Sequence, residues 1–175
     1  MSDLGQRLLD ASYLEGDFLL HSGRRSKFYL DKYLFSTKPD LLRDIAARLT
    51  EKLGGYEPFD LLAGPELGAV AIVAAVSLVS NKPFVIVRKG AKGYGTDKVM
   101  EGESIAGQRV VVIEDVVTSG GAALMAAEML RGAGLEVKAL LCVVDREEGG
   151  REHIEESGLI FDPLFTATSL GITKS

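Results

Sequence analysis

The sequence predicts an α/β fold whose central, mainly parallel sheet is flanked by helices on both faces. Apolar runs typical of buried strands alternate with helical patterns along most of the chain, and such alternation gives parallel strands joined by helical crossovers. The strands are expected at about residues 60–63, 84–87, 110–113 and 137–144. The helices are expected at about residues 68–80, 122–132 and 147–157. With 175 residues, no repeat and no linker, the chain fits one domain.

The N-terminal part differs from this alternation. Leucines recur at helical spacing in residues 3–14, which predicts an amphipathic helix. Apolar runs at 18–20 and 27–30 flank Ser-Gly-Arg-Arg and indicate a β-hairpin. We therefore expect a hood, residues 1–35, which the C-terminal edge of the chain completes, beside a core of about residues 36–165.

The core begins and ends with recognisable elements. Pro39 favours a helix start, an apolar face follows it, and Gly54-Gly55 ends the helix. A last apolar piece, residues 159–165, predicts an edge strand.

Composition excludes several classes of protein. A net charge of −5 argues against a general nucleic-acid binder. The N-terminus lacks a basic-then-apolar signal pattern, and the longest apolar stretch, residues 69–79, is too short to cross a bilayer. The single cysteine, Cys142, permits no internal disulfide. We expect a cytoplasmic protein with no membrane and no nucleic-acid partner.

The most informative stretch is residues 110–122. An apolar β-branched run leads to Glu114 and Asp115, and Thr-Ser-Gly-Gly then opens a helix. A helix start reached through small residues offers free N–H groups and a positive dipole end to a phosphate. Adjacent acids suit sugar hydroxyls or a nearby magnesium ion, whereas an ordinary helix cap explains only one polar residue. The pattern indicates a sugar-phosphate site, since neither a P-loop nor a dinucleotide fingerprint is present.

The connection over residues 88–102 is unusually long for a compact α/β protein. It carries Arg88, Lys89 and Lys92 near its start and glycines that allow it to hinge. Connections of this kind are usually functional lids, although a solvated β-hairpin remains an alternative. Beside a sugar-phosphate site, its cations suit a departing pyrophosphate.

Residues 110–122 resemble the ribose-phosphate signature of type I phosphoribosyltransferases. Four further segments, in order, are similar to the orotate phosphoribosyltransferase family. They are the hairpin at 22–31, the pyrophosphate loop at 63–68, the lid Arg88-Lys89-x-x-Lys92-x-x-Gly95-Thr96, and Asp145-Arg146. The resemblance implies transfer of ribose 5-phosphate from phosphoribosyl pyrophosphate (PRPP) to orotate, a step of pyrimidine (UMP) biosynthesis, with a long flexible lid closing over the pyrophosphate.

The resemblance also implies roles for individual residues. Catalysis falls to the lid lysine and the two acids, Lys92, Glu114 and Asp115. PRPP binding falls to the lid, the acids and the turn after them: Arg88, Lys89, Lys92, Tyr94, Glu114, Asp115, Val116, Val117, Thr118, Ser119, Gly120, Gly121 and Ala122. Orotate binding falls to Tyr29, Leu30, Thr118 and Arg146. A guanidinium such as that of Arg146 can meet the orotate carboxylate and carbonyl groups bidentately.

The expected cofactor is Mg²⁺, carried mainly by the substrate, because no His/Cys/Asp cluster has metal-ligand spacing. The family further implies a homodimer in which the lid of one subunit serves the partner's site. Two departures stand out: Tyr94 replaces a histidine of many relatives, and the pyrophosphate loop carries Glu66-Leu67 and no lysine. A purine-specific transferase and a non-catalytic regulator are the competing hypotheses.

Overall fold

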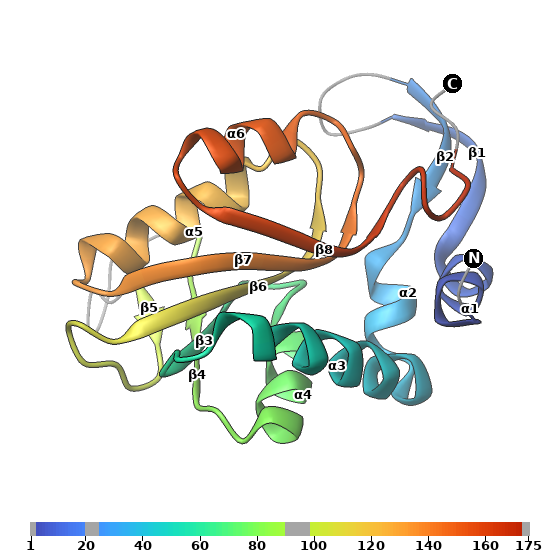
Figure 1. The fold of residues 1–175 in the computed structure, drawn as a ribbon. Helices are drawn as coiled ribbons and strands as arrows, with labels where there is room; N and C mark the ends of the chain where they lie inside the picture. The colour runs from blue at the N-terminus through green and yellow to red at the C-terminus, as the bar shows by residue number, and fades with distance from the viewer. Residues whose placement is uncertain (1–2, 20–24, 90–98, 173–175) are drawn as a thin grey trace.

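The computed structural model describes residues 3–19, 25–89 and 99–172, and its described part contains a six-stranded sheet (Figure 1). The strand order is β5-β4-β3-β6-β7-β8. The strands are β3 (Leu61–Pro65), β4 (Phe84–Val87), β5 (Met100–Glu101), β6 (Arg109–Val117), β7 (Glu136–Asp145) and β8 (Ile160–Thr166). β5 runs antiparallel to β4, and the other neighbouring pairs are parallel. The predicted mainly parallel sheet is confirmed.

Helices cover both faces of this sheet, as Figure 1 shows. α3 (Pro39–Leu53) and α4 (Val70–Ser80) lie on one face, and α5 (Gly121–Gly132) and α6 (Gly150–Glu156) lie on the other. Successive side chains of a strand point to opposite faces. In β6, Val111 and Ile113 accordingly pack toward α3 and α4, and Val110 and Val112 pack toward α5. A strand buried on both faces reads as a continuous apolar run.

The hood comprises α1 (Asp3–Ser12), β1 (Tyr13–Leu19), β2 (Arg25–Leu30) and α2 (Lys32–Ser36). β1 and β2 pair antiparallel, so the predicted hairpin is confirmed. The first helix ends two residues before the predicted end because Tyr13 already pairs with Leu30. Leu8, Leu30 and Phe35 anchor the hood in the core on the α3 side, where Leu170 near the C-terminus also packs. No helix in the described ranges is long and apolar enough to cross a membrane.

Several elements differ from the sequence prediction, among them α6, which begins at Gly150, three residues later than predicted. The short helix α2 and the two-residue strand β5 were not expected; both are too short to show a periodic pattern. The strand predicted over 110–113 extends to Val117, so Glu114 and Asp115 lie within β6. Acidic residues are rare in buried strands, which is why the sequence pattern places the strand end before them.

The connections of β3 and β6 create the crevice of the fold. These strands are neighbours, with Ala63 opposite Val112. β3 leads into α4 on one face, whereas β6 leads into α5 on the other. Ligands of open α/β sheets bind at such a switch point, outside the carboxyl ends of the strands.

Candidate active site

The two acids of β6 form the centre of a cavity at this switch point. Both are buried, Glu114 at 6% and Asp115 at 1% exposure. The backbone N–H of Asp115 donates to Glu114 Oε1 at 3.0 Å, and that of Val116 donates to Asp115 Oδ1 at 2.5 Å. The remaining oxygen, Asp115 Oδ2, lies 2.8 Å from Nζ of Lys32 in the hood. Asp115 is thus paired with the cation Lys32.

Burial and charge give the members of this cluster different protonation tendencies. Burial, together with the negative charge of Asp115, raises the pKa of Glu114 to about 8. Burial opposes the charged form of Lys32, but its hydrogen bond to Asp115 and the nearby carboxylates prevail, and the pKa of Lys32 is raised. At neutral pH the cluster therefore favours a protonated Glu114 beside a Lys32–Asp115 ion pair.

The turn after β6 lines a hollow that adjoins this cavity. The hollow is bordered by Glu114, Val116, Val117, Thr118, Ser119, Gly120, Gly121, Ala122 and Ala123. Gly120, the N-cap of α5, has φ +82°, a left-handed conformation that favours glycine. Thr118 and Ser119 are exposed at the mouth. Backbone N–H groups at the start of α5 and two hydroxyls can therefore meet an anion here.

Helix α6 supports this turn from behind. A Cβ on Gly150 would lie 2.4 Å from the Thr118 carbonyl oxygen, so only glycine permits this close packing. Nδ1 of His153 lies 3.0 Å from the Ser119 carbonyl oxygen. The structure thus places the exposed His153 against the turn.

The loop of residues 66–69, between β3 and α4, forms the opposite wall of the cavity. Its peptide bond Glu66–Leu67 is cis. Oε1 of Glu66 accepts a hydrogen bond from the Lys89 backbone at 2.8 Å, which joins this loop to the start of the lid. A Cβ on Gly68 would lie only 1.6 Å from Asp115 Oδ2. Glycine at residue 68 is therefore what lets the buried acid lie against the loop.

Two of the predicted cations reach the same cavity. Arg88 and Lys89 line it together with the acids. Arg88 Nη1 lies 3.4 Å from Glu101 Oε1 of β5, so the short strand helps to hold the first lid residue. Lys92 and Tyr94 lie outside the described residues.

Arg146 occupies the carboxyl end of β7, beside the turn. Its backbone N–H donates to the Val117 carbonyl at 2.8 Å. The side chain is 8% exposed, lies 4.9 Å from the centroid of the Phe28 ring and pairs with Glu148 at 2.9 Å. The arginine thus connects the sheet edge to the hairpin of the hood, although it does not line the cavity of the acids.

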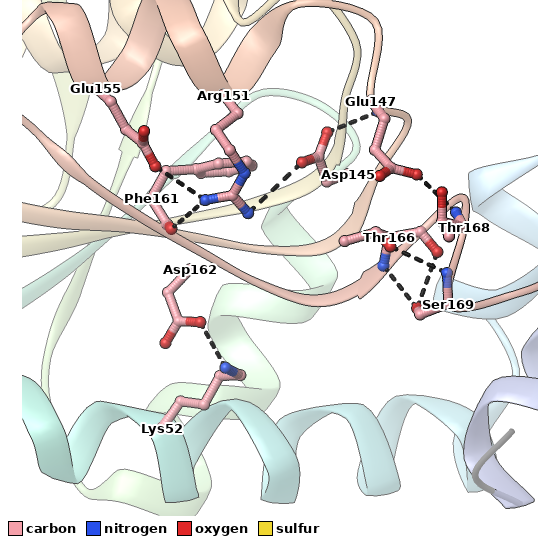
Figure 2. A network of polar contacts seen from close by, with 10 residues as sticks. All are labelled: Lys52, Asp145, Glu147, Arg151, Glu155, Phe161, Asp162, Thr166, Thr168 and Ser169. Carbon is pink, nitrogen blue, oxygen red and sulfur yellow. Dashed lines mark hydrogen bonds and ion pairs between the residues drawn. The ribbon is translucent and has the colours of Figure 1, made fainter.

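A polar network fixes the segment that carries Arg146 (Figure 2). Asp145 Oδ1 accepts from the Glu147 backbone at 2.8 Å, and Arg151 Nη2 lies 3.8 Å from Asp145 Oδ2. Glu147 Oε2 accepts from the Thr168 backbone at 2.6 Å. Burial of Asp145 raises its pKa despite these contacts. The network joins β7, α6 and the C-terminal turn into one support.

The other residues predicted to bind orotate lie in the hairpin and in the turn after β6. Tyr29 is 40% exposed and faces Phe18 across the hairpin at 5.6 Å. The Leu30 side chain is buried in the core, so only its backbone is available to a ligand. Thr118 is exposed on the turn, next to the strand pair that ends at Val117 and Asp145. The hairpin, the turn and Arg146 therefore border one edge of the sheet.

Sequence reasoning missed Lys32 and the close packing at Gly68 and Gly150. The signal for Lys32 was its position directly after the hairpin segment, where it follows Asp31 within an otherwise apolar run. The two glycines stood in the sequence without a turn pattern that demands them. Their importance comes from neighbours distant in the chain, which the sequence pattern does not reveal.

Metal binding is limited by the same geometry. In the described ranges, no group of three or more His, Cys, Asp or Glu side chains gathers closely enough to hold an ion. Asp115 is already engaged by Lys32. Mg²⁺ accepts one or two carboxylates plus substrate phosphates and keeps several waters, so this donor set fits a metal ion brought by a polyphosphate substrate.

Fold and site together define a phosphoribosyltransferase. Residues 37–158 match the family model of the phosphoribosyl transferase domain, and the chain belongs to this family. More particularly, it is 46% identical to an orotate phosphoribosyltransferase of Methanocella arvoryzae, over 89% of this chain and 87% of the relative. It therefore falls among the orotate phosphoribosyltransferases.

Solved structures agree with this assignment. The Aeropyrum pernix orotate phosphoribosyltransferase is 32% identical, with a TM-score of 0.84 over 95% of both chains. The Mycobacterium tuberculosis enzyme, solved in complex with PRPP, is 28% identical, with a TM-score of 0.82 over 97% of both chains.

Proposed function

We propose that this chain transfers ribose 5-phosphate from PRPP to orotate, giving orotidine 5′-monophosphate and pyrophosphate in cytoplasmic pyrimidine biosynthesis. The observation that carries the proposal is the meeting of two buried acids with an anion-binding turn and three cations at one sheet edge. An activated sugar phosphate needs these three kinds of group together. The similarity to an enzyme solved with PRPP supports the choice of phosphoribosyl donor.

The reaction breaks the bond between ribose C1 and the pyrophosphate oxygen, and the electron pair leaves with pyrophosphate. A bond then forms from C1 to the orotate nitrogen, and the proton of that nitrogen passes to solvent. Positive charge develops on the ribose between these events. The protein therefore has to position the partners and balance charge, and it needs no protein nucleophile.

The paired acids match this task. In our proposal Asp115, which pairs with Lys32, accepts from a ribose hydroxyl and stabilises the developing positive charge. Glu114, whose pKa is raised to about 8, carries a proton at neutral pH and donates it in a hydrogen bond to a ribose oxygen. One acid that donates beside one that accepts suits two adjacent hydroxyls.

The two anionic ends of PRPP would bind on either side of the acids. The turn of residues 117–122 would hold the 5-phosphate through its N–H groups and hydroxyls. Arg88 and Lys89, joined by Lys92 from the lid, would meet the pyrophosphate. When bound, Mg²⁺ neutralises part of the pyrophosphate charge, and the phosphates supply most of its ligands.

Orotate would lie between the hood and the turn. Arg146 would exchange part of its contact with Glu148 for the ring carboxylate. Tyr29, the backbone of Leu30 and Thr118 would complete the pocket.

The test is spectrophotometric. The wild-type chain with magnesium and PRPP should consume orotate, and Asp115→Asn should lower kcat/KM by about 10²–10³-fold, the usual cost of losing one transition-state contact. Purine bases offered in the same assay should not react. Persistent orotate, or turnover of a purine in its place, would reject the proposal.

We further propose a homodimer in which the lid acts in trans. Lys92→Ala and Asp115→Asn should each have very low activity, whereas a mixture that has exchanged subunits should recover one intact site per hybrid dimer. Absence of recovered activity, despite subunit exchange measured by mass spectrometry, would show that each lid serves its own chain.

A further inference from the structure

Lys32 has a fixed place in the fold. The Asp31 backbone N–H donates to the Ser12 carbonyl at 2.9 Å, which returns the hairpin to the end of α1. The Asp31 side chain then caps α2 by accepting from the Tyr33 N–H at 3.0 Å. Lys32 is the first residue of that capped helix, and Phe35 anchors the helix in the core. The hood therefore delivers this lysine to the cavity from a rigid support.

The side chain of Lys32 occupies space above the loop of residues 66–69. A Cβ on Gly68 would lie 2.8 Å from Lys32 Nζ as well as 1.6 Å from Asp115 Oδ2. The ammonium group thus lies where a side chain of the loop would otherwise project. The loop itself contributes Glu66 and no cation.

The cavity needs positive charge to bind pyrophosphate, and Lys32 is one of its cations. Glu66 and Asp115 contribute negative charge to its lining, and pyrophosphate brings more. Besides Lys32, the described lining contains two cations, Arg88 and Lys89, both from the start of the lid. Lys32 is thus the cation of this lining that belongs to the hood, on the side of the ribose-binding acids.

We propose that Lys32 binds the pyrophosphate group of PRPP and supplies, from the hood, the positive charge that the loop of residues 66–69 lacks. This inference rests on the proposed function and assigns a further residue to the same site. Before PRPP binds, Asp115 holds the ammonium in place. Once PRPP is bound, the ribose hydroxyls take over Asp115, and pyrophosphate oxygens accept hydrogen bonds from Nζ. In the free chain the hydrogen bond to Asp115 raises the pKa of Lys32, so the ammonium is charged when PRPP arrives.

A purely structural role for Lys32, limited to neutralising Asp115, makes a different prediction. Asp115→Asn removes the charge that such a role requires. In that background, Lys32→Met leaves no unpaired carboxylate behind, so any further loss of pyrophosphate affinity reports the lysine contact itself.

The experiment is calorimetric titration with magnesium pyrophosphate, which contains neither ribose nor orotate. We expect Lys32→Met to weaken binding at least tenfold in the wild-type chain and again in the Asp115→Asn chain, while Lys32→Arg retains most of it. Lys52→Met is the matched control. Lys52 lies on α3 and pairs with Asp162 (Figure 2), and its side chain is 32% exposed against 36% for Lys32. Lys52 does not line the cavity of the acids.

Kinetics supply the second readout. Lys32→Met should raise the KM for PRPP and leave the KM for orotate within twofold. Equal pyrophosphate affinities of Asp115→Asn and Asp115→Asn/Lys32→Met would overturn the inference, as would a Lys32→Met chain that binds as tightly as Lys52→Met. The proposed function fails separately, if the wild-type chain binds pyrophosphate but leaves orotate unconsumed.

Discussion

Replacing Gly68 with alanine tests the geometry of the site directly. The added Cβ would lie 1.6 Å from Asp115 Oδ2, whereas normal contacts between non-bonded heavy atoms are about 3.5 Å. The carboxylate has to move by about 2 Å. It is poorly able to do so, because it is buried and its other oxygen accepts a 2.5 Å hydrogen bond from the Val116 backbone. The movement would also break its contact with Lys32.

The expected effect is larger on catalysis than on folding. A reacting group displaced by about 1 Å can cost about 10²-fold in rate, so kcat/KM for PRPP should fall by about 10²-fold or more. Overpacking a core site costs about 1–3 kcal/mol, which most folded chains survive. Orotate consumption measures the first quantity, and urea unfolding measures the second.

Gly55→Ala is the control, since a Cβ on Gly55 has no neighbour within 4 Å. It should leave activity unchanged. If Gly68→Ala folds and keeps kcat/KM within threefold of the wild type, the claim that a close-fitting Gly68 positions Asp115 is wrong.

Three other changes probe separate parts of the site. In the folded chain the pKa of Glu114 is about 8, whereas the unfolded chain releases this proton near the ordinary pKa of 4.5. Glu114 therefore makes the free energy of unfolding fall as pH rises from 4.5 to about 8. Glu114→Gln should remove that part of the fall, and an identical pH dependence of urea unfolding in both chains would contradict this prediction. Gly150→Ala should displace the Thr118 carbonyl and weaken the binding of ribose 5-phosphate, measured by calorimetry, about tenfold. That loss corresponds to about 1.4 kcal/mol of binding free energy. Unchanged affinity would show that the turn adapts to the added methyl group. Arg146→Lys loses the bidentate fork, so steady-state kinetics should show the KM for orotate raised about tenfold or more and the KM for PRPP unchanged. An unchanged KM for orotate would show that orotate binds elsewhere.

Local sequence patterns predicted much of the fold. β4 matches its predicted bounds, and β7 and α5 fall within one residue of theirs, because buried strands and their helices have strong hydrophobic patterns. The acids and the turn after them were predicted to lie together for a similar reason: they are consecutive in the chain. The cluster of Glu114, Asp115 and residues 117–122 is thus a local feature, which one stretch of sequence can reveal.

Contacts between distant segments were harder to predict from the sequence. The predicted lid cations Arg88 and Lys89 reach the cavity because β4 and β6 flank β3 in the sheet. That strand order does not follow from any one segment. Arg146 was expected near a pocket, but its burial against Phe28 of the hood depends on how the hairpin folds over β7.

By itself, the amino-acid sequence determined the alternating α/β architecture and the sugar-phosphate motif, because both are written in consecutive residues whose burial and turn preferences act locally. Tertiary structure alone decided that Lys32 meets Asp115, that Gly68 leaves room for this pair, and that Gly150 supports the turn. Each of these contacts joins residues that lie about 30 or more positions apart in the chain. Their strength depends on distances and burial that exist only once the sheet has assembled.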